Sequence, residues 1–293
     1  MSGEARAGMI VVRLTGGLGN QMFQYALGRK LALARGVPLR LDIDVFASDR
    51  KRAYRLDNLK IQAEPATPAD MRGLRPRFRK LARRREALFG RSPRLVLEHG
   101  FGFDPAVLDC APNAYLDGYW QAEPYFADIR DTLIEDFRPR LPLSEARQDL
   151  LAQIAETTAV SVHVRRGDYV SNAKIAAQHG HLPADWYRAA MQSMAENLEN
   201  PTFFVFSDDP AWVRANLASD WPLHLVDFGD DREYEDLHLM ARCHHHVTAN
   251  SSFSWWGAWL DPRPDKIVIA PRQWFRASDV DTRDLVPADW QRL

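Results

Sequence analysis

Short apolar runs alternate with segments of helical periodicity along most of the chain. The run over residues 9–14 has the length and composition of a buried strand. Apolar residues then recur at helical spacing over 23–34, and Gly36 follows as a stop signal. A further run over 37–43 predicts a second strand. Strand, helix and strand in this order predict a unit of a parallel α/β sheet.

The alternation is most regular in the second half of the chain. Further strands are predicted over 113–117, 160–164, 202–206, 223–226, 246–249 and 266–269, and helices over 185–197, 210–218, 233–242 and 251–260. Apolar strands that alternate with helices indicate a doubly wound parallel sheet. Prolines at 139 and 142 mark an interdomain stretch. We expect Rossmann-like domains over 1–145 and 146–293 that face each other across a cleft, and the last helix could return to the first domain.

Composition narrows the class of protein. The chain has 293 residues, enough for two cores, and its net charge of −1 excludes a polyanion binder as a whole. Two cysteines argue against a disulfide framework and favour a reducing compartment. No apolar run approaches the roughly 18 residues that span a bilayer, and the first eight residues do not resemble a signal peptide. We therefore expect a cytoplasmic protein.

One segment departs from this charge balance. Between Arg72 and Arg94 lie ten basic residues and one acid, Glu86. The segment could be a solvated helical face, or it could dock on an anionic membrane surface such as the inner membrane, where each cation gains about 1 kcal/mol. It matches no nucleic-acid motif and carries only two aromatics, Phe78 and Phe89, so we expect no nucleic-acid partner.

A glycine-rich turn follows the first predicted strand. Gly17 and Gly19 lie within Thr15-Gly-Gly-Leu-Gly-Asn20-Gln21, just before a helix. Glycine lets the backbone approach a ligand closely, and a helix N-terminus offers N–H groups to an anion. The spacing matches neither the dinucleotide fingerprint nor a P-loop. A plain tight turn is the alternative.

The strand over 160–164 ends in charged residues. His163 and Arg165 alternate onto one face, and Arg166 and Asp168 follow. A guanidinium matches phosphate geometry in a bidentate way, so these residues predict an anion site in which Asp168 holds an arginine in place. A strand-end salt-bridge cluster is the alternative.

Acids follow the strand over 202–206. Asp208 or Asp209 could accept hydrogen bonds from guanine or ribose. Either could equally cap the helix that Pro210 opens.

The strand over 246–249 leads into small polar residues and then into aromatics. Asn250, Ser251 and Ser252 offer hydroxyl and backbone donors to a phosphate, and Ser251 could also cap the helix. Trp255 or Trp256 could line a sugar site, although such a run more often packs.

The three histidines at 244–246 suggest a metal, but strand alternation points the middle ring away from its neighbours. No carboxylate at ligand spacing completes a site. We expect no metal and no cofactor.

Four segments together carry a family resemblance. GGLGNQMFQYALG at 16–28, HVRRGDYV at 163–170, FVFSDDP at 204–210 and ANSSFSWWGAWL at 249–260 resemble the bacterial α1,2-fucosyltransferases, glycosyltransferase family 11. The resemblance spans nearly the whole chain. It implies a GT-B-like arrangement, GDP-β-L-fucose as donor, inversion at the anomeric carbon, no metal, and a galactose-terminated acceptor, as in O-antigen or oligosaccharide biosynthesis.

The resemblance also implies roles for single residues. Arg165 matches an arginine that grips the diphosphate, and His163 lies near the nucleotide. Asp208 or Asp209 would face guanine or ribose, and Ser252 would contact phosphate. Asn20 would reach the donor from the N-terminal domain. Protein O-fucosyltransferases carry an arginine three residues before this asparagine, where the present chain has Gly17, so no role of that arginine is implied.

The residues expected in catalysis are Arg165, Asn20 and Asp168. A general base stays open, since Asp168, Glu123 and Asp117 qualify only by type. Two other functions also stay open: transfer from GDP-fucose with another linkage, and binding of a nucleotide sugar without turnover. The oligomeric state is open as well.

Overall fold

A computed structural model describes residues 8–49, 51–167, 170, 172, 176–177, 180–276 and 280–293. The chain forms two compact units, one of Met1–Arg138 with Arg283–Leu285, the other of Pro139–Thr282 with Val286–Leu293. The second unit thus begins at the first proline of the predicted interdomain stretch. A short return segment near the C-terminus joins the first unit. Each unit is built on one parallel sheet, so the predicted α/β class is confirmed.

The N-terminal unit contains a five-stranded sheet in the order β3-β2-β1-β5-β4. Its strands are β1 (Ile10–Arg13), β2 (Leu39–Asp42), β3 (Glu64–Pro65), β4 (Leu95–Leu97) and β5 (Ala114–Asp117). The apolar runs that predict β1, β2 and β5 correspond to these strands. β3 and β4 lie at the edges of the sheet and were not predicted.

Helix α1 (Leu18–Arg35) covers this sheet, and the predicted stop is confirmed because Gly36 ends it with φ +61°. A Cβ on Gly28 would lie 2.5 Å from the side chain of Val12, so glycine lets α1 approach β1 closely. The other helical segments are η1 (Asp44–Ala47), η2 (Leu56–Asn58), α2 (Pro68–Met71), α3 (Arg79–Phe89), η3 (Pro105–Asp109), η4 (Glu123–Tyr125), η5 (Ala127–Ile129) and α4 (Arg130–Asp136).

The C-terminal unit contains a six-stranded parallel sheet in the order β11-β10-β9-β6-β7-β8. Its strands are β6 (Thr158–Val164), β7 (Pro201–Ser207), β8 (Leu223–Val226), β9 (His245–Val247), β10 (Val268–Ala270) and β11 (Gln291–Arg292). The chain winds outward from β6 through β7 and β8, then crosses back to β9 and winds the other way. This order is that of a doubly wound, Rossmann-like sheet.

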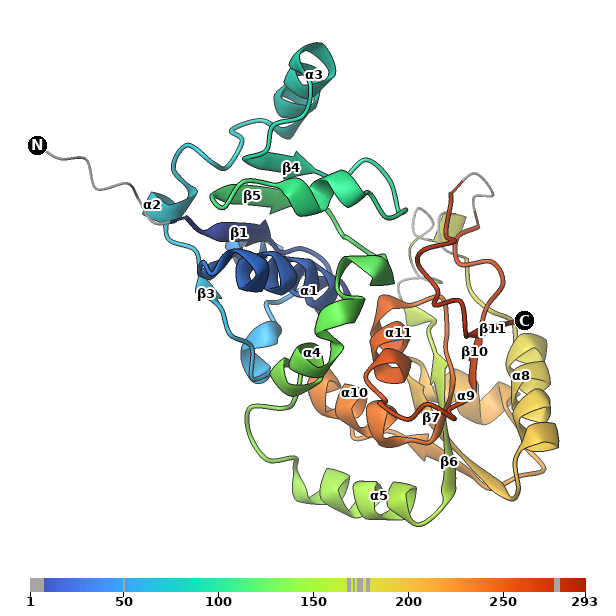
Figure 1. The fold of residues 1–293 in the computed structure, drawn as a ribbon. Helices are drawn as coiled ribbons and strands as arrows, with labels where there is room; N and C mark the ends of the chain where they lie inside the picture. The colour runs from blue at the N-terminus through green and yellow to red at the C-terminus, as the bar shows by residue number, and fades with distance from the viewer. Residues whose placement is uncertain are drawn as a thin grey trace, which may run out of the picture. The chain divides into compact units, whose positions relative to one another are not determined.

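Helices cover both faces of this second sheet (Figure 1). They are α5 (Glu145–Ala155), α8 (Ala184–Asn197), α9 (Pro210–Asn216), α10 (Glu233–Arg242) and α11 (Ser252–Trp259). One face packs β6 and β7 against α8 and α9, and the other packs them against α5 and α10. Because both faces of the sheet are buried, its strands consist of nearly continuous apolar residues. Such runs are recognisable in the sequence, which is why these strands could be predicted.

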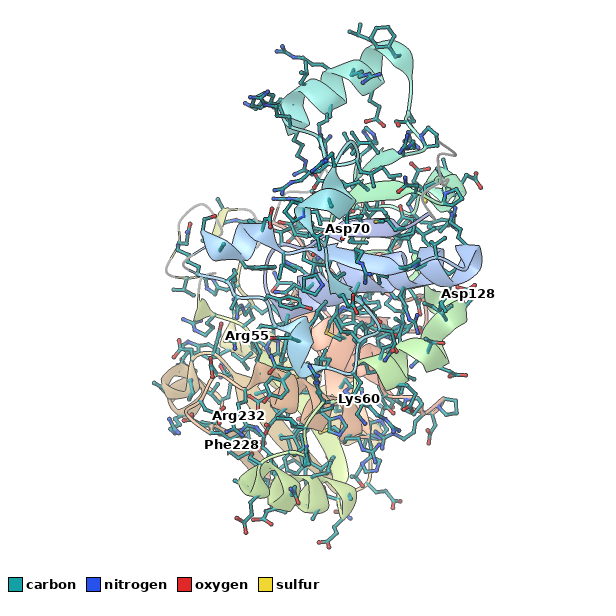
Figure 2. The ribbon with its side chains drawn as sticks, turned by 90° about the vertical axis from the view of Figure 1, so that its left-hand side faces the viewer. Arg55, Lys60, Asp70, Asp128, Phe228 and Arg232 are labelled. Carbon is teal, nitrogen blue, oxygen red and sulfur yellow. The ribbon has the colours of Figure 1, made fainter. Side chains whose placement is uncertain are left out.

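A buried arginine ties the loop before α10 to α5 within the C-terminal unit. The side chain of Arg147 is 2% exposed and pairs with Asp230 at 2.8 Å, Asp236 at 3.0 Å and Glu235 at 3.4 Å. Its guanidinium lies 4.1 Å from the centre of the Phe228 ring. Figure 2 labels Phe228 and Arg232, which lie close together in this loop. The cluster therefore holds one segment of chain against a helix.

Among the residues that the structure describes, none of the helices combines the length and apolar composition needed to cross a bilayer.

Candidate functional site

The predicted site residues of the C-terminal unit follow three neighbouring strands. β6 lies between β7 and β9, and the winding direction of the sheet changes between β6 and β9. In open parallel sheets, ligands bind outside the carboxyl ends of the strands at this switch point. The loops after β6, β7 and β9 carry the predicted arginines, aspartates and serines. The fold thus brings three of the four predicted clusters to one edge of one sheet.

Arg165 is the first residue after β6, and its guanidinium forms an ion pair with Asp208. Its Nη1 lies 2.8 Å from Asp208 Oδ2, and the two side chains are 22% and 26% exposed. The other oxygen of Asp208 accepts a hydrogen bond from the backbone N–H of Arg166 at 2.8 Å. A Cβ on Gly167 would come within 2.5 Å of the same carboxylate. Asp208 thus fixes the backbone after β6 and orients the guanidinium group of Arg165.

Arg166 is held by a second acid. Its Nε donates to Asp209 at 3.2 Å, and its guanidinium lies 4.2 Å from the centre of the Trp212 ring. Asp209 also accepts from the backbone N–H of Trp212 at 3.0 Å and so caps α9. The capping alternative is therefore confirmed for Asp209.

Asp168, predicted to hold an arginine, lies outside the described residues. In the described structure the acid that pairs with Arg165 is Asp208. The cluster thus contains the strand-end ion pairs that the residue types allowed. Both carboxylates bind arginine in the structure. The contacts with guanine or ribose that the family resemblance implies for these aspartates stay a prediction.

His163 lies beneath this cluster. It is 5% exposed, and burial, aided by the charge of Arg165, lowers the pKa of its imidazole to about 3. Its ring centre lies 5.5 Å from that of Phe253. The buried Nδ1 has no hydrogen-bond partner among the described residues. His163 is therefore a neutral side chain with unused hydrogen-bonding capacity, and buried atoms of this kind call for an explanation.

The loop after β9 leads into α11. Ser251 caps this helix by accepting from the backbone N–H of Phe253 at 3.3 Å, and Ser252 is its first residue. Asn250 is 2% exposed and donates to the carbonyl oxygen of Trp274 at 3.2 Å. The serine segment therefore stands at a helix N-terminus, where the backbone favours an anion.

The tryptophans of α11 have a different role. Trp255 and Trp256 are both 0% exposed, and their rings pack edge to face at a centroid distance of 4.9 Å. They belong to the core of the C-terminal unit. The interpretation that either lines a sugar site is wrong.

The fourth predicted cluster lies in the N-terminal unit, at the carboxyl end of β1. Gly16 adopts φ +82°, Gly17 caps α1, and Gly19 is buried in the first turn of the helix. Asn20 accepts a hydrogen bond from Gln121 at 2.8 Å. Gln121 follows β5, the neighbour of β1, so two loops meet at this edge.

Sequence reasoning missed Gln121. It comes four residues after a predicted strand, and the rule that polar residues beyond strand ends form sites could have found it. Gln21, from the same turn, donates to the carbonyl oxygens of Gly16 at 2.9 Å and Ala53 at 2.8 Å. Its amide therefore fixes the shape of the turn.

The candidates for a general base occupy different environments. Asp117 ends β5, is 3% exposed, and pairs with Arg13 at 3.3 Å and Arg79 at 3.0 Å. These pairs make it a structural acid. Glu123 is half-buried at the start of η4, and its backbone N–H donates to the carbonyl oxygen of Asp284.

The three consecutive histidines serve the sheet. His246 is buried, with Nδ1 2.8 Å from the Ser161 hydroxyl and Nε2 3.1 Å from Asp261. His245 Nδ1 accepts from the backbone N–H of Ile267 at 3.0 Å. Across the described part of the chain, no three His, Cys, Asp or Glu side chains gather in a way that could hold a metal ion.

Comparisons with known proteins place the chain in a family. The family model described as glycosyl transferase family 11 matches residues 99–292. An α1,2-colitosyltransferase of Escherichia coli is 33% identical, covering 97% of this chain and 99% of the relative. An O-antigen biosynthesis glycosyltransferase of the same species, WbnK, is 34% identical over 91% of this chain and 95% of its own length.

Two matches are more distant. A galactoside 2-α-L-fucosyltransferase of Bos taurus is 30% identical, but the match covers only 51% of this chain and 43% of the relative. Among solved structures, an FUT1 variant of Arabidopsis thaliana in complex with GDP superposes with a TM-score of 0.53 at 13% identity, covering 98% of this chain and 76% of that one. This likeness shows the fold, which is of the GT-B-like α/β class.

Proposed function

The chain belongs to glycosyl transferase family 11, and we propose that it moves L-fucose from GDP-β-L-fucose to the 2-hydroxyl of a terminal galactoside. The observation that carries this proposal is the meeting of Arg165, Asp208 and the N-terminus of α11 at the switch point of the C-terminal sheet. A guanidinium and a helix N-terminus both favour a phosphate. The linkage in the names of two relatives, α1,2 and 2-α, supports the choice of hydroxyl.

The proposed transfer breaks one bond at the fucose C1 and forms another. The bond between fucose C1 and the β-phosphate oxygen breaks, and its electron pair leaves with GDP. The acceptor 2-hydroxyl forms the new bond to C1 from the opposite face and gives its proton to water, so the configuration inverts. Negative charge develops on the departing phosphate. Arg165, the Ser252 hydroxyl and the N–H groups of α11 stabilise that charge and need no metal ion to do so.

Other residues position these groups. Asp208 pairs with Arg165 and so presets the direction of its fork. A guanidinium can bind a carboxylate and a phosphate together because its five donors point in several directions. His163, neutral beneath the arginine, offers its buried Nδ1 to the nucleotide or to a water that the nucleotide orders. On the acceptor side, Gln121 orients the amide of Asn20.

A second donor is favoured by one comparison. The relative that is named an α1,2-colitosyltransferase matches this chain almost end to end. Colitose is L-fucose without its 3-hydroxyl, so GDP-colitose would fit the same nucleotide site. A site that hydrogen-bonds the 3-hydroxyl rejects the deoxy sugar by up to about 10⁴-fold, whereas an apolar site rejects the extra hydroxyl by only about 10²-fold.

The decisive experiment offers purified protein GDP-fucose and GDP-colitose in parallel, with a panel of β-galactosides, with and without a chelator. We expect fucose in an α1,2 linkage, unaffected by the chelator, and a kcat/KM for GDP-colitose at least 10²-fold lower. A preference for GDP-colitose would mean that colitose, not fucose, is the sugar transferred. A product with another linkage would mean that the acceptor reacts through a hydroxyl other than the 2-hydroxyl. GDP binding without release of product from any acceptor would mean a binding protein without turnover.

A further inference from the structure

Helix α3 of the N-terminal unit exposes apolar side chains to solvent. None of its eleven described residues is buried. Leu81, Leu88 and Phe89 are 61%, 76% and 81% exposed, and Phe78, which caps the helix, is 60% exposed. In Figure 1, α3 stands away from the strands of its own unit. Single exposed apolar residues are ordinary, but four on one short element form a patch that calls for a partner.

The opposite, polar face of α3 attaches it to the rest of the N-terminal unit. Arg79 pairs with Asp117 at 3.0 Å. Arg83 donates to the carbonyl oxygen of Glu98 at 2.8 Å, and Glu86 binds His99 at 3.0 Å. These residues recur at helical spacing on one side. The helix is therefore anchored by ion pairs and not by apolar packing.

The exposed face combines leucines with cations. Leu81 and Leu88 are seven residues apart and share one stripe, while Arg84 and Arg85 fall on its two edges. All four side chains are exposed. At the N-terminal end, the guanidinium of Arg77 lies 5.5 Å from the centre of the Phe78 ring. The surface is thus an apolar stripe with a basic rim.

This amphipathicity is inverted with respect to an ordinary surface helix, which buries its apolar stripe against the core. A helix with exposed Leu and Phe and a rim of Arg is typical of one that lies in a membrane interface. The whole basic segment from Arg72 to Arg94 adds charge of the same sign. Charge complementarity therefore points to an anionic partner, and the leucines point to one with an apolar interior.

We propose that α3 docks the protein on an anionic lipid bilayer, with Leu81, Leu88 and Phe89 among the acyl chains and Arg84 and Arg85 at the headgroups. A second copy of the chain fits less well, because a symmetric contact would set like charges against each other. A nucleic acid would leave the leucines in water. The proposal does not depend on which sugar the protein transfers.

The test measures binding of the full chain to phosphatidylcholine vesicles with and without phosphatidylglycerol. We expect binding only to the anionic vesicles, and weaker binding at high salt. Leu81→Ser/Leu88→Ser should lower the partition coefficient about tenfold or more. Arg84→Glu/Arg85→Glu should lower it at least about 25-fold, because each cation near such a surface contributes roughly fivefold.

The matched control is Leu33→Ser/Leu141→Ser, which removes two exposed leucines elsewhere, 44% and 70% exposed. It should bind vesicles like the wild type. All variants should unfold in urea like the wild type and transfer sugar to a water-soluble acceptor at the wild-type rate. These two readouts separate a lost docking surface from a lost fold.

Three outcomes would overturn the proposal. The wild type could ignore anionic vesicles, or the leucine variant could bind them as tightly as the wild type. The protein could also self-associate through Leu81 and Leu88 without binding vesicles, in which case the occupant of this face is a second copy. None of these three outcomes bears on the proposed sugar transfer, which is measured separately with the two sugar nucleotides.

Discussion

The C-terminal unit contains two arginine clusters that use the same chemistry in different places. Arg147, on α5, is 2% exposed and meets three carboxylates. Arg165, at the tip of β6, is 22% exposed and pairs with Asp208. The first cluster has more acid than base and lies at a helix on one face of the sheet. The second lies at the carboxyl ends of the strands.

Place and charge balance, not residue type, thus separate the structural Arg147 from Arg165, the arginine proposed to bind the diphosphate. Around Arg147 the surplus carboxylates would repel an incoming anion. Among the described residues at the tip of β6, Arg165 pairs with Asp208 and Arg166 with Asp209, and a helix N-terminus follows the neighbouring strand. A diphosphate is therefore favoured at the strand tips and disfavoured beside α5.

The largest effect is expected when the buried cluster loses Arg147. Arg147→Met removes the cation that Asp230, Glu235 and Asp236 share and leaves only the half-exposed Arg232 beside the first two. The pKa of Asp236 is already raised by burial. Removing one partner of a buried ion pair typically costs about 3–5 kcal/mol. We expect the free energy of unfolding in urea to fall by that amount, while GDP affinity in the surviving folded protein stays at the wild-type value.

If Arg147→Met does not fold, Asp230→Asn provides the milder test, because the Asp230 side chain is 36% exposed. A loss of GDP affinity without a loss of stability would place Arg147 in the ligand site and erase the distinction between the clusters.

A smaller effect concerns His163, the neutral neighbour of Arg165. Its folded pKa of about 3 lies below the ordinary value of 6.5, so the unfolded chain takes up a proton first as the pH falls. This contribution to stability is complete above pH 6.5 and is lost progressively toward pH 3. Between pH 6.5 and 5 the free energy of unfolding should fall by about 2 kcal/mol on account of this group.

His163→Phe removes this titration and should flatten the pH dependence of the free energy of unfolding over that range. His246→Phe serves as the comparison, since burial also lowers the pKa of His246, to about 4. An unchanged slope in His163→Phe would show that the imidazole takes up its proton over the same pH range in the folded and unfolded chain, so that folding does not lower its pKa.

The smallest expected effect separates the two members of the strand-tip pair. Asp208→Asn keeps the shape of the side chain and its hydrogen bond to the backbone of Arg166, but loses the charge that orients Arg165. We expect kcat to fall about tenfold, roughly 1.4 kcal/mol, with GDP affinity unchanged or higher. A loss as large as that of removing Arg165 itself would mean that Asp208 contacts the sugar nucleotide directly.

The sequence predicted the strands and helices where apolar side chains cover both faces of a sheet. It missed β3, β4 and β11, edge strands of two or three residues, because so short a segment has no periodicity. It also missed α5, which follows the prolines of the interdomain stretch. In the basic segment it indicated helix without bounds, since α3 is not held by apolar packing.

The site was predicted as separate clusters, and the pairing of its charges was not. Val164 lies opposite Ser207 in the register of β6 and β7, so the next residues, Arg165 and Asp208, emerge side by side. Sequence alone does not say which strands are neighbours. It therefore offered Asp168, an acid close by in the chain, as the one that holds an arginine, which the described residues do not test, and it did not foresee the pair of Arg165 with Asp208.

The role proposed for Arg165 is tested by the effect of Arg165→Ala on the individual kinetic constants for GDP-fucose and a β-galactoside, in the presence of a chelator. Arg188→Ala, an exposed arginine of α8 that pairs with Asp185, is the matched control. If Arg165 stabilises charge that develops only as GDP departs, as proposed, kcat should fall about 10²–10³-fold, with a smaller change in KM and no change in unfolding. Turnover near the wild-type rate from folded Arg165→Ala protein would contradict the account.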